Sequence, residues 1–286
     1  MKYFDLHCDT LCRCADEKAM LEKNDFHIDI ERLSTFEKAT QVFACFIHDD
    51  YKGEGAINRF YQLYNVYKNT DFKNVMPMLS IENLSCLNGN IENIAKFKEC
   101  GVKIASLTWN DENGIAGGVN SDRGLTDFGK EVVKELERED IVIDVSHLNF
   151  KSFADLCSVA TKPFIATHSN SFSVFPHKRN LTDEQFELIA DIGGVVGINF
   201  YHKFLCEKEN DFYDFLNHIE RFLLLGGEES IALGSDFDGC EIHSSLKAVE
   251  NMPNLYAFLE RELGKTITDK IFYKNCASFF QNTLTK

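Results

Sequence analysis

The fold of this chain is decided by a stretch close to its N-terminus, Tyr3-Phe4-Asp5-Leu6-His7-Cys8-Asp9-Thr10. The aromatic and aliphatic residues at its start favour a short buried strand, and a core would not accommodate the polar residues that follow. Because side chains alternate along an extended chain, His7 and Asp9 project to the same side where the strand ends. An imidazole and a carboxylate that converge there supply two ligands for a divalent metal ion.

Continuous apolar runs of strand length recur along the rest of the chain, and most are separated by residues at helical spacing. Such runs are typical of strands in parallel sheets that are covered on both faces. With the opening stretch they predict eight strands, at residues 3–6, 41–47, 75–81, 102–107, 141–145, 163–167, 195–199 and 231–234. Strands that alternate with helices in this way predict an α/β fold, a (β/α)8 barrel of the TIM type.

The composition agrees with one globular domain. The chain has 286 residues, of which 44% are hydrophobic and 26% charged, with only 4 prolines and 17 glycines. An α/β barrel of this length is commonly a single domain, and no linker or repeat divides the chain. We therefore expect residues 1–286 to form one barrel domain.

The charge and the cysteines limit the partners and the compartment. A formal net charge of −15 argues against nucleic acid or an acidic membrane as a partner, because phosphates would be repelled, and leaves small ligands and metal ions. The start of the chain has no signal-like segment, and no apolar run is long enough to span a bilayer. We therefore expect a cytoplasmic protein whose 10 cysteines are reduced, with Cys8, Cys12 and Cys14 as buried free thiols rather than a metal cluster.

Polar residues with ligand chemistry follow the last apolar residue of several predicted strands. They are His7, Asp9, Glu82, His147, His168 and Asp236. In a barrel of this type the carboxyl ends of the strands meet at one mouth, so these side chains are expected to converge. Three histidines and three carboxylates are too many for one tetrahedral zinc ion, but they suit two metal ions that share a bridging carboxylate. The remaining histidines lack this placement and are interpreted as surface or loop residues: His27, His48, His177, His202, His218 and His243.

Eight segments stand out in order along the chain. They are DLHCD (5–9), SIE (80–82), GLTDFG (124–129), IDVSH (143–147), ATHS (166–169), KRNLTD (178–183), GGVVGINFY (193–201) and GSDFDG (234–239). This series resembles the membrane (renal) dipeptidase family, zinc peptidases built on amidohydrolase-type barrels. The resemblance covers most of the chain, and the GSDFDG and RNLTD motifs are its most specific parts.

The resemblance implies two zinc ions per chain. It assigns one ion to His7 and Asp9 and the other to His147 and His168, with Glu82 bridging them. A hydroxide held between the two ions would attack the peptide carbonyl of a small dipeptide.

The resemblance also implies roles for three further residues. Asp236 would take a proton from the attacking water and hand it to the leaving amine. Arg179 would receive the free C-terminal carboxylate of the substrate, because a guanidinium matches a carboxylate bidentately. Tyr201 matches a family position near the substrate. The expected partner is thus a small dipeptide, with a homodimer as a candidate assembly.

One departure from the family pattern lies in a long glycine-rich loop, residues 108–124. Where the animal enzymes carry a histidine that polarises the substrate carbonyl, this chain has Trp109 followed by Asn110. Trp109 cannot ionise, and its only polar group is the indole N–H. Either that donor or Asn110 substitutes for the histidine, or the reaction lacks this help.

Two other functions fit the same residues. A related binuclear hydrolase would act on another small amide, ester or phosphoester, and Arg179 would then contact a different group. A non-catalytic barrel would bind metal without turnover. Hydrolysis of dipeptides, measured together with metal content, distinguishes the three functions.

Overall fold

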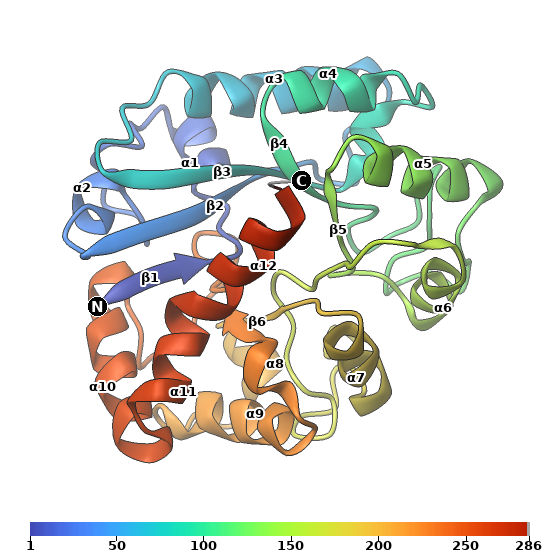
Figure 1. Cartoon of the computed structure of the whole chain (residues 1–286). Coiled ribbons are helices and arrows are strands. Elements are labelled where there is room, and N and C mark those ends of the chain that lie inside the picture. The colour runs from blue at the N-terminus through green and yellow to red at the C-terminus, as the bar shows by residue number, and fades with distance from the viewer. Residues whose placement is uncertain (285–286) are drawn as a thin grey trace.

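The structure, a computed structural model, describes residues 1–284, and strands alternate with helices through most of them (Figure 1). The strands are β1 (Lys2–Asp5), β2 (Lys38–Phe46), β3 (Val75–Glu82), β4 (Val102–Ser106), β5 (Val142–Asp144), β6 (Val196–Ile198) and β7 (Ile231–Leu233). The helices are α1 (Thr10–Glu17), α2 (Ile30–Leu33), α3 (Glu54–Lys68), α4 (Asn93–Glu99), α5 (Asp127–Arg138), α6 (Phe150–Val159), α7 (Asp183–Asp191), α8 (His202–Leu205), α9 (Tyr213–Leu224), α10 (Met252–Leu263), α11 (Lys265–Asp269) and α12 (Asn275–Leu284).

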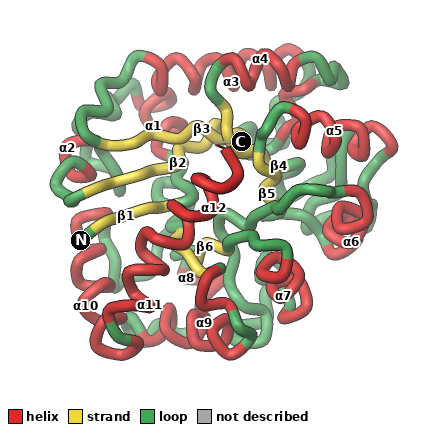
Figure 2. Tube along the Cα trace, viewed as in Figure 1, coloured by secondary structure: helices red, strands yellow, loops and turns green. Residues whose placement is uncertain are grey.

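The seven strands found within residues 1–284 form one parallel sheet in the order β5-β4-β3-β2-β1-β7-β6. Figure 2 shows these strands in the middle of the molecule, with helices around them. The opening stretch does form a strand, and it joins the two halves of the sheet because Asp5 aligns with Gln41 of β2 and with Leu233 of β7. The predicted α/β class and parallel sheet are confirmed.

The predicted sixth strand, residues 163–167, is not formed as a strand. This segment pairs through single parallel bridges, of Ile165 with Asp144 of β5 and of Ala166 with Val196 of β6. It therefore lies between β5 and β6 with too few paired residues to count as a strand. The structure thus has seven strands and this bridged segment where eight strands were expected, and the complete eight-stranded barrel is not confirmed.

Two glycines allow the bridged segment to approach its neighbours closely. A Cβ atom added to Gly197 would lie 2.1 Å from the carbonyl oxygen of Thr167, and one added to Gly234 would lie 1.9 Å from the same oxygen. Both distances are far inside van der Waals contact, so a side chain at either position would push the segment outward. The two glycines therefore help to place His168, which follows Thr167.

Apolar side chains form two cores, one on each face of the sheet. The larger core lies between the strands and the surrounding helices. The smaller one joins inward-facing strand residues such as Phe4 and Val42 to Cys276, Phe279 and Phe280 of α12. In Figure 1, α12 runs across the middle of the ring of strands. This helix fills one end of the sheet's interior, and the polar strand ends occupy the other.

Among residues 1–284, no helix combines the length and the apolar character needed to cross a membrane.

Candidate active site

The end of β1 is held in place by the carboxylate of Asp5, which is fully buried. It accepts hydrogen bonds from the backbone N–H and the hydroxyl of Ser235, at 2.8 and 2.6 Å, and from the side chain of Gln41 at 3.1 Å. Burial raises the pKa of Asp5, while these hydrogen bonds lower it. Because Ser235 follows β7, this contact fixes the strand ends that carry His7 and Asp236.

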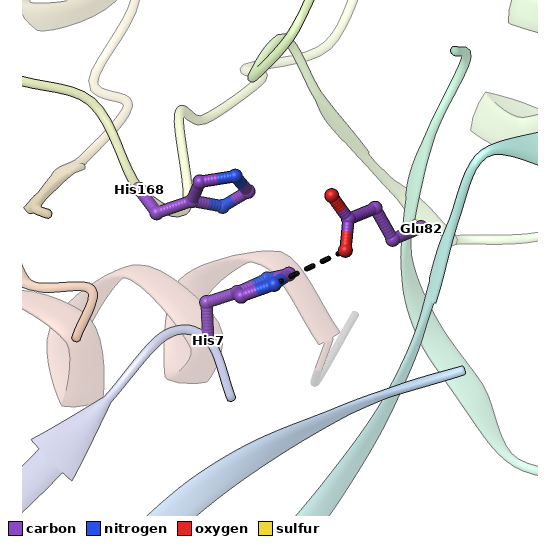
Figure 3. A group of neighbouring side chains, drawn as sticks. All are labelled: His7, Glu82 and His168. Carbon is purple, nitrogen blue, oxygen red and sulfur yellow. Dashed lines mark ion pairs between the residues drawn. The ribbon is translucent and has the colours of Figure 1, made fainter. Parts of the chain in front are cut away.

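Five of the predicted metal ligands come together at the carboxyl ends of the strands. The Nε2 atom of His7 lies 3.3 Å from Asp9 Oδ2 and 3.3 Å from Glu82 Oε2. The other Glu82 oxygen, Oε1, lies 2.8 Å from His147 Nε2, which in turn lies 2.9 Å from His168 Nε2. Figure 3 shows His7, Glu82 and His168 pointing toward one another, with Glu82 paired to His7. The carboxylate of Glu82 thus lies between two histidines, as a bridging ligand would.

The outer nitrogens of His147 and His168 have partners that fix the tautomers of both rings. Thr167 donates its hydroxyl proton to Asp144 at 2.6 Å, so at 2.8 Å its oxygen accepts from Nδ1–H of His168. Likewise, Nδ1–H of His147 donates to the side-chain oxygen of Asn110 at 3.0 Å. Both Nε2 atoms are therefore unprotonated in the neutral rings, the form in which histidine binds a metal ion.

This cluster of side chains is electrostatically more favourable with a bound cation than without one. Two unprotonated Nε2 atoms face each other beside a carboxylate oxygen, and they repel unless a positive charge lies among them. The Oδ1 atom of Asp9 is buried and has no hydrogen-bond partner within residues 1–284. Ligand atoms of His7, Glu82 and His168 all lie within 4.8 Å of one another, as do those of His7, Asp9 and Asp236. The donor set of imidazoles and carboxylates is one that divalent metal ions use.

Burial and mutual proximity shift the pKa values of these groups in opposite directions. Burial, followed by the nearby Asp9, raises the pKa of Glu82 to about 7. Burial alone would lower the pKa of His7, but Asp9 and Glu82 outweigh it and raise that pKa well above its usual value. Burial, together with nearby positive charges, lowers the pKa values of His147 and His168 well below normal. Below about pH 7 the metal-free site therefore favours a protonated His7 and a protonated Glu82, while the rings of His147 and His168 stay neutral.

Asp236 lies beside this cluster and is held by its own contacts. Its Oδ2 accepts a hydrogen bond from Asn199 Nδ2 at 3.0 Å. Burial, opposed by His7 and reinforced by Asp9, raises the pKa of Asp236 to about 6. A carboxyl with a pKa near neutrality can both accept and return a proton.

The backbone at the site has unusual features. His147 and Asp236 have positive φ angles of 75° and 60°, a left-handed conformation that is uncommon for residues with a side chain. Gly239 packs directly against the carboxylates, since a Cβ atom there would lie 2.2 Å from Asp9 Oδ2 and 2.5 Å from Asp236 Oδ1. The strand ends are thus turned so that their side chains face one point.

A cavity of about 880 Å³ opens over the cluster. The predicted substrate-binding residues all line it: Trp109, Asn110, Arg179 and Tyr201. The Arg179 side chain is only 6% exposed, and its Nε and Nη2 atoms have no hydrogen-bond partner within residues 1–284. Burial lowers the pKa of Arg179, and nearby carboxylates, Asp236 first, raise it. A buried guanidinium with free donors is suited to a bound anion.

Some of the residues at or near the site were not predicted. His48 and His177, interpreted from the sequence as surface or loop residues, both line the cavity. His218 lies within α9 and is fully buried, so that interpretation was wrong for it, and His243 is in a loop but is also fully buried. Asn199 carries a signal that could have been used, because this polar residue directly follows the buried strand β6, just as the predicted metal ligands follow other predicted strands. Cys8, Cys12 and Cys14 are buried free thiols, as expected.

Comparison with known proteins identifies the family. A family model described as membrane dipeptidase (peptidase family M19) matches residues 68–283, well over half of the chain. The chain belongs to the membrane dipeptidase family. The family predicted from the eight sequence segments is confirmed, and with it the assignment as a metallo-dipeptidase.

Individual relatives are also similar to this chain. An uncharacterized Klebsiella pneumoniae protein from the pqqA 5′ region is 34% identical over 73% of this chain and 82% of its own length. The chain spans less than half the length of two uncharacterized dipeptidases of Schizosaccharomyces pombe, 45% of one and 49% of the other.

Two solved structures share the whole fold. The crystal structure of dipeptidase AC, an M19 metallo peptidase, has a TM-score of 0.93 at 24% identity and covers 99% of this chain and 98% of its own. A Rhodobacter sphaeroides metallo peptidase, liganded with a phosphinate mimic of the dipeptide L-Ala-D-Ala, has a TM-score of 0.90 at 23% identity, with 99% of both chains covered. At these identities the two likenesses establish the fold of this chain.

The hydroxyl of Thr167 provides a first test of the site. We expect Thr167→Val to weaken metal binding by about 10–100-fold, because His168 then loses the acceptor that fixes its tautomer. Competition with a chromogenic chelator measures this affinity. The matched control is Thr108→Val, since the buried hydroxyl of Thr108 has no partner within residues 1–284. Equal affinities of the two variants would contradict the role given to Thr167.

Proposed function

We propose that this chain hydrolyses the peptide bond of small dipeptides that carry a free C-terminal carboxylate, and that it does so with two zinc ions. His7 and Asp9 would hold one ion and His147 and His168 the other, with Glu82 between them. The observation that carries the proposal is the contact of both Glu82 oxygens with histidine Nε2 atoms, at 3.3 and 2.8 Å. When bound, a metal pair supplies a hydroxide at neutral pH and polarises the scissile carbonyl.

The protein's own groups would then position the substrate and move the proton. Asp236, with its pKa raised to about 6, would accept the proton of the attacking water and return it to the leaving amine. Asn199 would keep the carboxylate of Asp236 oriented through its 3.0 Å hydrogen bond. Arg179 would bind the terminal carboxylate of the substrate through its free donors. A dipeptide mimic bound to the R. sphaeroides protein supports this choice of substrate class.

Trp109 and Asn110 would have different roles. Asn110 accepts from His147 Nδ1 at 3.0 Å, so it orients a proposed metal ligand. The Trp109 ring lines the cavity, and its centroid lies 5.2 Å from the ring centroid of Phe46 and 5.0 Å from that of His48. We propose that Trp109 forms part of the wall that faces the substrate, where the indole N–H, the one donor of its side chain, could bind a carbonyl. Tyr201 would line the same cavity from another side.

The domain organisation and the cellular compartment are also proposals. Residues 1–286 would form a single domain, with residues 163–167 completing an eight-stranded barrel. All 10 cysteines, which fall within the described residues, are free, and this supports a reducing compartment such as the cytoplasm.

A substrate panel with metal analysis tests the function. We expect the purified protein to hold two zinc ions per chain and to hydrolyse dipeptides, while dipeptides with an amidated C-terminus react poorly. Turnover of another amide, ester or phosphoester without dipeptide hydrolysis would support a related hydrolase instead. Full metal content without any turnover would support a non-catalytic barrel.

Proton release on metal binding is a second expected result. Near pH 6 the metal-free site holds protons on His7 and on Glu82, whose pKa is about 7, and metal ions must displace them. We expect on the order of one to two protons released per pair of ions, and affinity that rises with pH as these groups lose their protons. Calorimetric titration with zinc in buffers of different ionisation enthalpy measures the release. Heats that are independent of the buffer would contradict this prediction.

A further inference from the structure

The segment that carries Asp236 is a tight turn with an unusual backbone. It follows β7, and the N–H of Gly239 donates to the carbonyl oxygen of Asp236 at 3.1 Å. Asp236 and Asp238 both have left-handed backbone conformations, with φ angles of 60° and 68°. Such conformations are uncommon for residues with a side chain, so neighbouring groups must hold this segment in its shape. We call residues 235–239 the Asp236 turn.

The side chain of Asp238 joins the Asp236 turn to two segments near the N-terminus. Its carboxylate is completely buried. One oxygen, Oδ1, accepts hydrogen bonds from the backbone N–H of His27 at 2.8 Å and from Nη1 of Arg13 at 3.3 Å. The other oxygen, Oδ2, accepts from the hydroxyl of Thr10 at 2.5 Å. The turn is therefore tied to helix α1 and to the loop that contains His27.

His27 forms a second hydrogen bond to Asp238, in the opposite direction. Its Nδ1 atom accepts from the backbone N–H of Asp238 at 2.9 Å. Burial lowers the pKa of His27, and the charge of Asp238 opposes this, so the ring is neutral at neutral pH and Nδ1 can accept. The ring centroid of His27 also lies 5.5 Å from that of Phe237. We call this pair of hydrogen bonds, which joins residues 211 positions apart, the Asp238–His27 clamp.

The place of the Asp236 carboxylate depends on the backbone of the turn. Only the bond between Cα and Cβ separates the carboxyl group from the backbone rotations, so a tilt of the turn moves the carboxylate with it. Phe237 is fully buried, and its ring centroid lies 5.6 Å from that of Phe200. A turn that is fixed at Phe237 by packing and at Asp238 by the clamp also fixes the direction of the preceding side chain.

We propose that Asp238 and His27 are positioning residues for Asp236, because the clamp holds the turn so that the carboxylate of Asp236 stays beside His7 and Asp9. Side-chain ligand atoms of those three residues lie within 4.8 Å of one another. The proposal rests on the proton transfer proposed above for Asp236 and adds the residues that aim it. Loosening the clamp would slow proton transfer, because a general base must lie within hydrogen-bond reach of the proton that it takes.

Two substitutions of His27 separate its hydrogen bond from its packing. His27→Phe keeps a ring beside Phe237 but removes the acceptor for the N–H of Asp238, whereas His27→Asn keeps an acceptor close to the place of Nδ1. We expect His27→Phe to lower kcat for the best dipeptide of the panel about tenfold or more, with KM within about twofold, because a misplaced general base slows the chemical step without weakening binding. His27→Asn should keep most of kcat. Both variants should keep the zinc content of the parent.

A substitution at the other end of the clamp tests whether the two residues act together. Asp238→Gly removes the carboxylate, and glycine adopts the left-handed conformation readily, so the turn can still form. We expect Asp238→Gly to lower kcat at least as much as His27→Phe does. The loss in the double variant should be well below the product of the two single losses, because both residues act through the same turn.

The matched control is His243→Phe, in the loop that follows the Asp236 turn. The ring of His243 is completely buried, and its Nδ1 also accepts a backbone N–H, that of Ser245 at 3.2 Å. Neither residue lines the cavity over the metal-binding cluster. His243→Phe should lower thermal stability, because buried hydrogen bonds are lost, and should leave kcat per folded molecule near that of the parent.

The outcomes separate the two proposals. If the parent hydrolyses no dipeptide, the proposed function fails and the positioning role fails with it. If the parent is active, three results would overturn the positioning role alone: an unchanged kcat in His27→Phe, an equal loss in His27→Asn or His243→Phe, or a loss of zinc that accounts for the lower kcat.

Discussion

Replacing Glu82 by glutamine is expected to abolish most of the activity. Glutamine keeps the shape of the side chain, but it removes the negative charge that lies between His7 and His147, at 3.3 and 2.8 Å. Without that charge two cations would be held close together with less compensation, so at least one should be lost. We expect kcat/KM to fall by on the order of 10³-fold or more, a loss at least as large as that of one preorganised charged group. Metal content should fall in parallel, measured by elemental analysis of the purified variant.

A second buried glutamate serves as the control for this variant. Glu137 on α5 is 8% exposed, and its carboxylate accepts hydrogen bonds from the backbone N–H groups of Thr161 and Lys162, at 2.6 and 2.8 Å. Glu137→Gln should lower thermal stability, because these hydrogen bonds weaken, but should leave metal content and kcat per folded molecule near those of the parent. A Glu82→Gln variant that retains both ions and full turnover would refute the bridging role.

Removing the guanidinium of Arg179 is expected to have the second largest effect. Arg179→Met keeps much of the apolar stem that lies against Phe204, whose ring centroid is 5.6 Å from the guanidinium carbon. It removes the charge that would bind the substrate carboxylate. Loss of one member of a buried charge pair predicts a decrease of about 10²-fold or more in kcat/KM for dipeptides. Most of this should appear as a higher KM, because the group does not touch the reacting atoms.

A modified substrate isolates the contact of Arg179 with the carboxylate. For a dipeptide with an amidated C-terminus, the parent enzyme and Arg179→Met should differ little, since the anion that Arg179 would bind is absent. Steady-state kinetics with both substrates on both proteins complete the comparison. A variant that loses the same factor on both substrates would place the role of Arg179 in folding or metal binding instead.

The general plan of the fold could be predicted because strand patterns are local. The continuous apolar run at β2 and the run at β3 each specify a strand without reference to the rest of the chain. Residues 163–167 carry a similar pattern, yet this segment makes only two bridges. Its pairing depends on the close approach of Gly197 in β6 and of Gly234, which directly follows β7. Such a contact between distant segments cannot be read from the segment itself.

The side chains proposed to bind metal could be predicted for the same reason, since each lies at or just after the end of a predicted strand. The residues around them could not. Thr167 and Asp144 matter because one bonds His168 and the other bonds Thr167, a relation that exists only after folding. His48 reaches the cavity beside Trp109, which is far away in sequence. The sequence therefore indicates the proposed ligands, whereas the residues that orient them depend on packing.

The bonds between Asp5 and Ser235 join residues that are 230 positions apart. During synthesis, β1 emerges first and its edge toward β7 stays unpaired until nearly the whole chain has been made. Contacts of such long range form late and slowly. We therefore expect the proposed ligands His7 and Asp9 to reach their final places only after β7 has been made, so that tight metal binding would report that the whole chain has folded.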